Sequence, residues 1–75
     1  DINEIKASFV LTEYNGRIYI SARSIDEVNV QIIMERLGGG GHMNASGAQF
    51  NHTDMDEAVA CLTQVIDEMI EGGDI

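Results

Sequence analysis

One stretch of the sequence, RLGGGGHMNASG at 36–47, combines four consecutive glycines with a histidine and then several small residues. Each glycine gives up more conformational entropy on folding than any other residue, so four in a row suggest a specific need. Consecutive glycines can turn several backbone N–H groups toward one point and form a nest for an anion. His42 can donate to a phosphate oxygen or assist a leaving group. The stretch therefore predicts a phosphate-binding loop, with a flexible connector as the alternative.

Two common phosphate motifs do not describe this loop. The sequence has no GxxxxGK(S/T) pattern, and its glycines follow an expected helix instead of opening one, unlike those of a dinucleotide fingerprint. Nearby side chains must therefore help the backbone. Arg23 ends an expected strand beside Ser24, and an arginine there can bind a phosphate through two parallel hydrogen bonds. The alternative for Arg23 is an ordinary solvated side chain.

Two other groups of reactive residue types have simpler explanations. The segment NHTDMD at 51–56 contains possible metal ligands, but helix capping and compensation of the helix dipole explain the same residues. Cys61 flanks an apolar helical stripe without a basic neighbour, and we interpret it as structural. A single cysteine excludes an internal disulfide and favours a reducing compartment such as the cytosol.

Charge and length limit the function further. The net charge of −9 argues against non-specific nucleic-acid binding, although a few well-placed donors can still hold a small phosphate ligand. No apolar run approaches the roughly 20 residues of a membrane span, and no signal peptide opens the chain. The 75 residues form one small domain, 1–75, which begins without Met and is expected to be a piece of a larger protein.

The first part of the chain predicts a β-hairpin. Residues 6–14 and 17–23 alternate between apolar and polar side chains, and Asn15-Gly16 between them is a strong signal for a tight turn. The polar face of the second strand holds Arg17, Tyr19, Ser21 and Arg23.

The middle of the chain predicts a short helix at 30–37, capped by Asn29 and ended by Gly38. The glycine loop is expected to continue to about Asn44. A third strand is expected at 46–51.

The last helix begins after Thr53 or Asp54 and ends at Gly72-Gly73. Its apolar residues recur at helical spacing: Met55, Ala58, Val59, Leu62, Val65, Ile66 and Met69. The predicted fold class is α+β in the order β-β-α-β-α, with a small sheet built on the hairpin and both helices packed on it.

Two of these segments together match a known pattern. SARS at 21–24, followed after a short helix by GGGGHMNASG at 38–47, resembles the DHH-associated domain, the C-terminal lobe of DHH phosphoesterases. The family motif is a glycine run, a histidine, two variable residues, and then small residues with a glycine. The resemblance covers nearly the whole chain. In detail it is most similar to the bacterial membrane-anchored cyclic-di-AMP phosphodiesterases, although the exonuclease and nano-RNase branches share the motif.

The resemblance implies how the work is divided in such an enzyme. A separate DHH lobe holds two manganese ions and activates water, whereas the lobe seen here binds substrate. No Asp-His-His signature occurs in this chain, so we expect it to be inactive alone and to contain no catalytic residue, with His42 the candidate for an assisting role. The substrate-binding residues implied by the resemblance are Arg23, Ser24, Gly39, Gly40, Gly41, His42, Asn44, Ala45 and Ser46.

The expected function is substrate recognition in the hydrolysis of a cyclic dinucleotide, cyclic-di-AMP, to a linear dinucleotide. The alternatives are the substrate lobe of an exonuclease or nano-RNase that acts on short oligonucleotides, a non-catalytic nucleotide-binding module, and an interaction domain with an incidental glycine linker. The expected partner is the DHH lobe of the same chain, and a homodimer is a further candidate. The domain is placed at the cytoplasmic face of a membrane-anchored parent, without membrane contact of its own.

Overall fold

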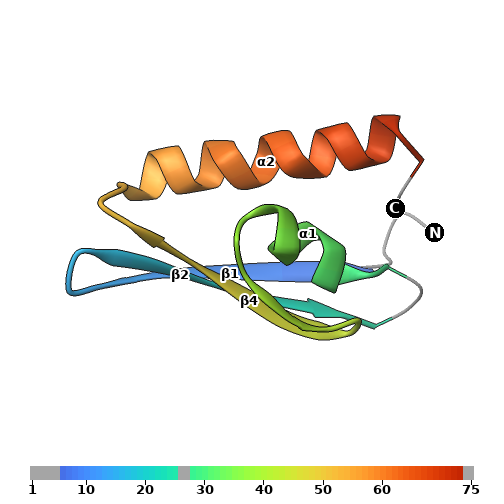
Figure 1. Ribbon diagram of the computed structural model, residues 1–75, viewed down its shortest axis with the longest axis horizontal. Coiled ribbons are helices and arrows are strands. Elements are labelled where there is room, and N and C mark those ends of the chain that lie inside the picture. The colour runs from blue at the N-terminus through green and yellow to red at the C-terminus, as the bar shows by residue number, and fades with distance from the viewer. Residues whose placement is uncertain (1–5, 26–27, 74–75) are drawn as a thin grey trace.

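The computed structural model describes residues 6–25 and 28–73. Within them a four-stranded antiparallel sheet carries two helices, and both helices lie on the same side of the sheet (Figure 1). This arrangement confirms the predicted α+β class, with one short strand added to the predicted order. The elements are β1 (Ala7–Tyr14), β2 (Arg17–Ser24), α1 (Val30–Arg36), β3 (Gly40–His42), β4 (Ala45–Asn51) and α2 (Met55–Glu71).

The predicted hairpin is confirmed. Strands β1 and β2 pair over their whole length, from Ala7 opposite Ser24 to Tyr14 opposite Arg17. Asn15 and Gly16 between them have φ of 53° and 75°, the positive values that a two-residue turn of this kind requires at both positions.

The sheet has the strand order β1-β2-β4-β3, and its two faces differ. Directly opposed residues of antiparallel strands point to the same side, and successive residues point to opposite sides. Ile18, Ile20 and Ala22 of β2 are buried on the side that carries the helices. Tyr19, Ser21 and Arg23 therefore point to the other side, which no described element covers (Figure 1). We call this side the open face.

The short helix α1 has the caps that the sequence predicts and ends one residue earlier than expected. The Asn29 side chain accepts a hydrogen bond from the Gln31 N–H at 3.0 Å. At the other end, Gly38 has φ of 87°, its N–H donates to the Glu35 carbonyl at 3.1 Å, and the Gly39 N–H donates to the Met34 carbonyl at 2.8 Å. This pair of bonds is a Schellman motif, which turns the chain back toward the sheet.

The long helix α2 begins after Asp54, whose carboxylate accepts a hydrogen bond from the Glu57 N–H at 2.8 Å. The capping interpretation of the acidic segment is thus confirmed for Asp54. Two predictions about side chains of this helix are wrong. Val59, assigned to the apolar stripe, is 45% exposed, and Cys61, interpreted as structural, is exposed. Both lie outside the row that packs on the sheet.

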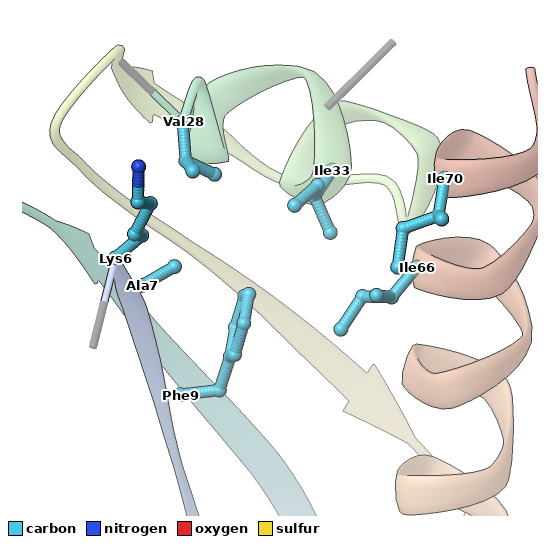
Figure 2. Close-up of a pocket in the computed structure, with 7 residues that line it drawn as sticks. All are labelled: Lys6, Ala7, Phe9, Val28, Ile33, Ile66 and Ile70. Carbon is cyan, nitrogen blue, oxygen red and sulfur yellow. The ribbon is translucent and has the colours of Figure 1, made fainter. Parts of the chain in front are cut away.

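The helices and β1 meet around an apolar groove of about 230 Å³ (Figure 2). The only nitrogen among the side chains drawn there belongs to Lys6, and the others present hydrocarbon alone (Figure 2). The lining residues are Lys6, Ala7, Phe9, Val28, Ile33, Ile66 and Ile70.

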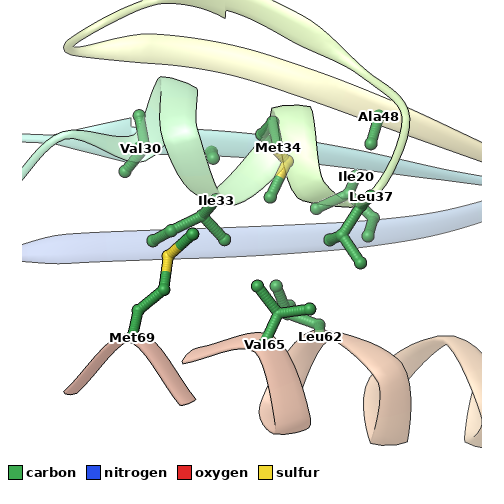
Figure 3. Packing of buried hydrophobic residues seen from close by; sticks show 10 residues of the cluster. Ile20, Val30, Ile33, Met34, Leu37, Ala48, Leu62, Val65 and Met69 are labelled. Carbon is green, nitrogen blue, oxygen red and sulfur yellow. The ribbon is translucent and has the colours of Figure 1, made fainter. Parts of the chain in front are cut away.

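The core lies between the sheet and the two helices (Figure 3). Leu62, Val65 and Met69 of α2 point toward Ile33 and its neighbours on α1 (Figure 3). Burial of this apolar surface stabilises the fold by roughly 25 cal/mol per Å² removed from water. The buried cluster contains Ile20, Ala22, Val30, Ile33, Met34, Leu37, Ala48, Leu62, Val65 and Met69.

The glycine stretch differs most from its prediction. A loop was expected as far as Asn44, but residues Gly40–His42 form β3, which pairs with β4 and is joined to it by a turn at Met43 and Asn44. The alternative of a flexible connector is therefore wrong, because these glycines belong to a paired strand.

Candidate functional site

At one end of the open face, three strands place one residue each in a single row. Arg23 of β2 lies opposite Ala45 of β4, which lies opposite His42 of β3. Neighbouring strands are about 4.8 Å apart, so the Arg23 and His42 backbones are about 10 Å apart with the small Ala45 between them. We call Arg23, Ala45 and His42 the basic row. It can hold an anion between a guanidinium group and an imidazole.

The two large side chains of the basic row are available to a ligand. Both Arg23 and His42 are exposed, as expected, and neither side chain makes a hydrogen bond or ion pair with the described residues. Arg36 differs, since its guanidinium group pairs with Glu68 of α2. Arginine always carries its charge, so Arg23 supplies a fixed positive group in a chain whose net charge is −9.

Two other predicted binding residues, Ser24 and Asn44, hold the row in place. Ser24 is buried, and its hydroxyl accepts a hydrogen bond from the Asn44 side-chain amide at 2.9 Å. The Ser24 N–H donates to the Asn44 carbonyl at 3.0 Å, and the Val30 N–H donates to the Met43 carbonyl at 3.0 Å. The β3–β4 turn is thus fixed to the end of β2 and the start of α1. Direct contact of Ser24 or Asn44 with a ligand stays a prediction.

Close packing explains two of the four glycines in the run, Gly39 and Gly41. A Cβ on Gly39 would lie 2.0 Å from the Gly47 carbonyl oxygen, closer than any real contact. Gly41 has φ of 143°, and its Cβ would lie 2.6 Å from the Ser46 Cα. At Gly40 an added Cβ would meet nothing within 4 Å, and the φ of Gly40 lies outside the left-handed range that favours glycine. Gly40 is therefore the glycine that the fold does not require.

Hydrogen bonds at the end of α1 change the predicted anion nest. The N–H groups of Gly38 and Gly39 donate to carbonyls of α1, as described above. They are therefore not available to a phosphate. The prediction of a nest built from consecutive N–H groups of the whole run is wrong. An anion at this end of the sheet must rely mainly on the basic row.

The structure does not bring all the predicted residues to one face. Ser46 lies between Ala22 and Gly41 in the sheet, so it points to the side of the helices. Its hydroxyl is buried without a hydrogen-bond partner among the described residues. The open face receives Arg23, Gly40, His42 and Ala45, while Gly41 and Ser46 face the helices.

Sequence reasoning missed a second part of the open face. Beside the basic row lies a hollow of about 420 Å³. Tyr19 and Gln49 lie opposite each other in the sheet there, and Ser21 lies opposite Gly47. The signal was present in the polar face of the second strand, where Tyr19 and Ser21 alternate in step with Arg23. The lining residues are Tyr19, Ile20, Ser21, Gly38, Gly39, Gly47, Ala48 and Gln49.

Two kinds of feature, a metal-binding cluster and a membrane-spanning helix, are absent from the described residues. Within 6–25 and 28–73, no group of three or more His, Cys, Asp or Glu residues could hold a metal ion. A two-metal centre therefore does not fit this part of the chain. In the same residues, no helix is long and apolar enough to cross a membrane.

A family model described as the DHHA1 domain matches residues 1–70 of the chain. The cyclic-di-AMP phosphodiesterase GdpP of Geobacillus thermodenitrificans is 45% identical over 73 residues, which are 96% of this chain and 11% of that protein. The cyclic-di-AMP phosphodiesterase PdeA of Listeria monocytogenes is 42% identical over 69 residues, which are 91% of this chain and 10% of that protein. The chain thus spans about a tenth of the length of these relatives.

Among solved structures, the fold is similar to that of an exopolyphosphatase-related protein from Bacteroides fragilis. The TM-score is 0.78 at 34% sequence identity, and the match covers 84% of this chain and 18% of the other. Like the sequence relatives, this protein is much longer than the part that matches.

Proposed function

Because the chain belongs to the DHHA1 domain family of DHH phosphoesterases, we propose that it is the substrate-binding lobe of a phosphodiesterase that hydrolyses cyclic-di-AMP to a linear dinucleotide. The observation that carries the proposal is the basic row, where Arg23 and His42 lie exposed on one face with the small Ala45 between them. The names of two relatives that are 45% and 42% identical support the choice of substrate.

In this proposal the chain binds and orients a phosphate. The Arg23 guanidinium group donates two parallel hydrogen bonds to phosphate oxygens, and His42 donates one from the opposite side. Ala45 has only a methyl group and Gly40 has no side chain, so neither carries a bulky group that would keep the phosphate away from the sheet. Donors fixed in this way hold the substrate in one orientation and offset its charge.

Metal binding belongs to another part of the enzyme in this proposal. The described residues do not fit a two-metal centre, so we assign the manganese ions expected from the family resemblance to a separate DHH lobe of the same polypeptide. The 75-residue chain alone is then expected to show no phosphodiesterase activity. We also place it at the cytoplasmic face of a membrane-anchored parent.

A second candidate substrate is a short linear oligonucleotide. The solved structure that is 34% identical belongs to an exopolyphosphatase-related protein, and its name favours an enzyme that works on chain-like phosphate substrates. The same basic row would then hold a phosphate at or near a chain end.

The test replaces Arg23 by alanine in the full-length protein. We expect kcat/KM for cyclic-di-AMP to fall by about 10- to 150-fold, which corresponds to a charge-assisted hydrogen bond of about 1.5–3 kcal/mol. The matched control is Arg17→Ala, since Arg17 lies on the same strand and the same face, at the opposite end of the strand from Arg23. Equal kinetics for the two variants would contradict the proposal. Faster turnover of linear dinucleotides than of cyclic-di-AMP would favour the second candidate.

A further inference from the structure

The hollow beside the basic row combines glycines with polar and aromatic side chains in its lining. Three of the lining residues are glycines: Gly38, Gly39 and Gly47. Tyr19 of β2 and Gln49 of β4 lie opposite each other on adjacent strands, one alternate residue along from Ser21 and Gly47. A flat group could therefore lie against the Tyr19 ring beside the glycines and reach the neighbouring Gln49 amide with its edge.

The Gln49 amide is held in a defined orientation. Its Nε2 donates to the Asn51 Oδ1 at 2.9 Å, and its side-chain oxygen, Oε1, has no partner among the described residues. The amide therefore still offers one acceptor and one N–H donor. This is the pair that matches adenine, whose N6 amino group donates beside the N7 acceptor, whereas guanine presents two acceptors at the same edge.

The hollow also lies at a useful distance from the basic row. Alternate residues of a strand are about 6.7 Å apart, so Ser21 and Gly47 lie one such step from Arg23 and Ala45, and Tyr19 and Gln49 lie two steps away. A nucleotide whose phosphate sits on the basic row can therefore extend its base along the open face into the hollow.

From this geometry we propose that the hollow is a nucleobase subsite, in which Tyr19 stacks on the base and Gln49 selects adenine over guanine. The proposal rests on the proposed function, because it takes the phosphate on the basic row as given. It adds a residue that determines base specificity. The basic row cannot provide this specificity, because a phosphate is the same in every nucleotide.

The test compares cyclic-di-AMP with cyclic-di-GMP in the full-length protein. Gln49→Leu should lower the ratio of the two kcat/KM values by roughly 5- to 150-fold, because a good bidentate contact discriminates between bases by that factor. Tyr19→Ala should reduce kcat/KM for both substrates by a similar factor, since stacking does not depend on the base. The matched control is Gln64→Leu, the same change at an exposed position of α2.

A substrate without a base separates this proposal from the preceding one. Hydrolysis of bis(p-nitrophenyl) phosphate should be unchanged in Gln49→Leu, whereas Arg23→Ala should slow it. If the wild-type enzyme hydrolyses neither cyclic dinucleotide, the proposed function fails and the base subsite fails with it. If Arg23→Ala impairs cyclic-di-AMP hydrolysis but Gln49→Leu leaves the substrate ratio unchanged, only the base subsite is overturned. A wild-type preference for cyclic-di-GMP would overturn it as well.

Discussion

The two faces of the sheet are built from alternate residues of the same strands, yet they differ in almost every property. On the side of the helices, β2 presents Ile18, Ile20 and Ala22, all at most 2% exposed. On the open face the same strand presents Tyr19 and Arg23, which no described element covers. The first set holds the domain together, and the second is left to interact with another molecule.

The difference between the two faces predicts which property of the protein a substitution changes. A change on the side of the helices should act mainly on the free energy of unfolding, whereas a change on the open face should act mainly on kcat/KM. Single substitutions on the two sides of the sheet test that division.

Ile33→Ala should give the largest loss of stability. Ile33 is 1% exposed and packs between the sheet and α2 (Figure 3). Deleting such a side chain costs about 2–5 kcal/mol, a large share of the stability of a small domain. Urea unfolding of the 75-residue chain measures the loss. Thr12→Ala, on the exposed side of β1, is the control and should change little. Equal unfolding midpoints would contradict the division between the faces.

His42→Ala should impair the full-length enzyme without destabilising it. Loss of a hydrogen bond to a charged phosphate costs about 1.5–3 kcal/mol, so kcat/KM should fall by at least about tenfold. The control is His52→Ala, because His52 is also exposed but lies in the connection before α2. If His42→Ala unfolds early, or if the two variants have the same kinetics, His42 does not bind substrate.

Gly39→Ala and Gly41→Ala should destabilise the fold through the backbone. At both positions a Cβ would collide with β4, and Gly41 also has a φ of 143°. Alanine at such sites costs more than about 1 kcal/mol. Thermal unfolding of the chain is the measurement, and a melting temperature equal to that of the unchanged chain would show that β3 does not pack as closely as described.

The pairing of Arg36 with Glu68 should have the smallest effect, which is present at neutral pH and disappears at acidic pH. The hydrogen bond from Arg36 holds the pKa of the Glu68 carboxyl below its usual value, with a further contribution from Gln64. A lowered pKa contributes stability above the pKa of the unfolded chain, and this contribution disappears as the pH falls through the pKa of the folded chain. Glu68→Gln should therefore flatten the acid limb of a stability–pH profile slightly. Glu71→Gln is the control. Identical profiles for the two variants would show that the ion pair is not maintained in solution.

Local patterns predicted most of the fold. The alternation of β1 and β2, the turn at Asn15 and Gly16, and the caps Asn29 and Asp54 depend on near neighbours in sequence, and all of them are confirmed. Strand β3 could not be predicted in this way. Three residues rich in glycine carry no alternation, and their pairing depends on contact with β4 across the turn.

The candidate site was only partly predictable for a related reason. Arg23 and His42 stand out by residue type, but their common row follows from the register of three strands. The same register turns Ser46 toward the helices, although it is next to Ala45 in sequence. Tyr19 and Gln49 were missed because polar and aromatic residues on an exposed strand face are ordinary until the sheet places them opposite each other.

Gly40→Ala in the full-length protein separates substrate binding from folding, because Gly40 is the glycine of the run that the fold does not require. Its Cβ would meet nothing in the described chain, so the substitution should leave the fold intact or stabilise it by about 0.4–1 kcal/mol. If a phosphate approaches the open face at this point, the same methyl group obstructs it, and kcat/KM for cyclic-di-AMP should fall by about tenfold or more. An unchanged or higher melting temperature with reduced kcat/KM is the predicted result. An unchanged kcat/KM would contradict the account, because the substrate would then not approach this face of the sheet at Gly40.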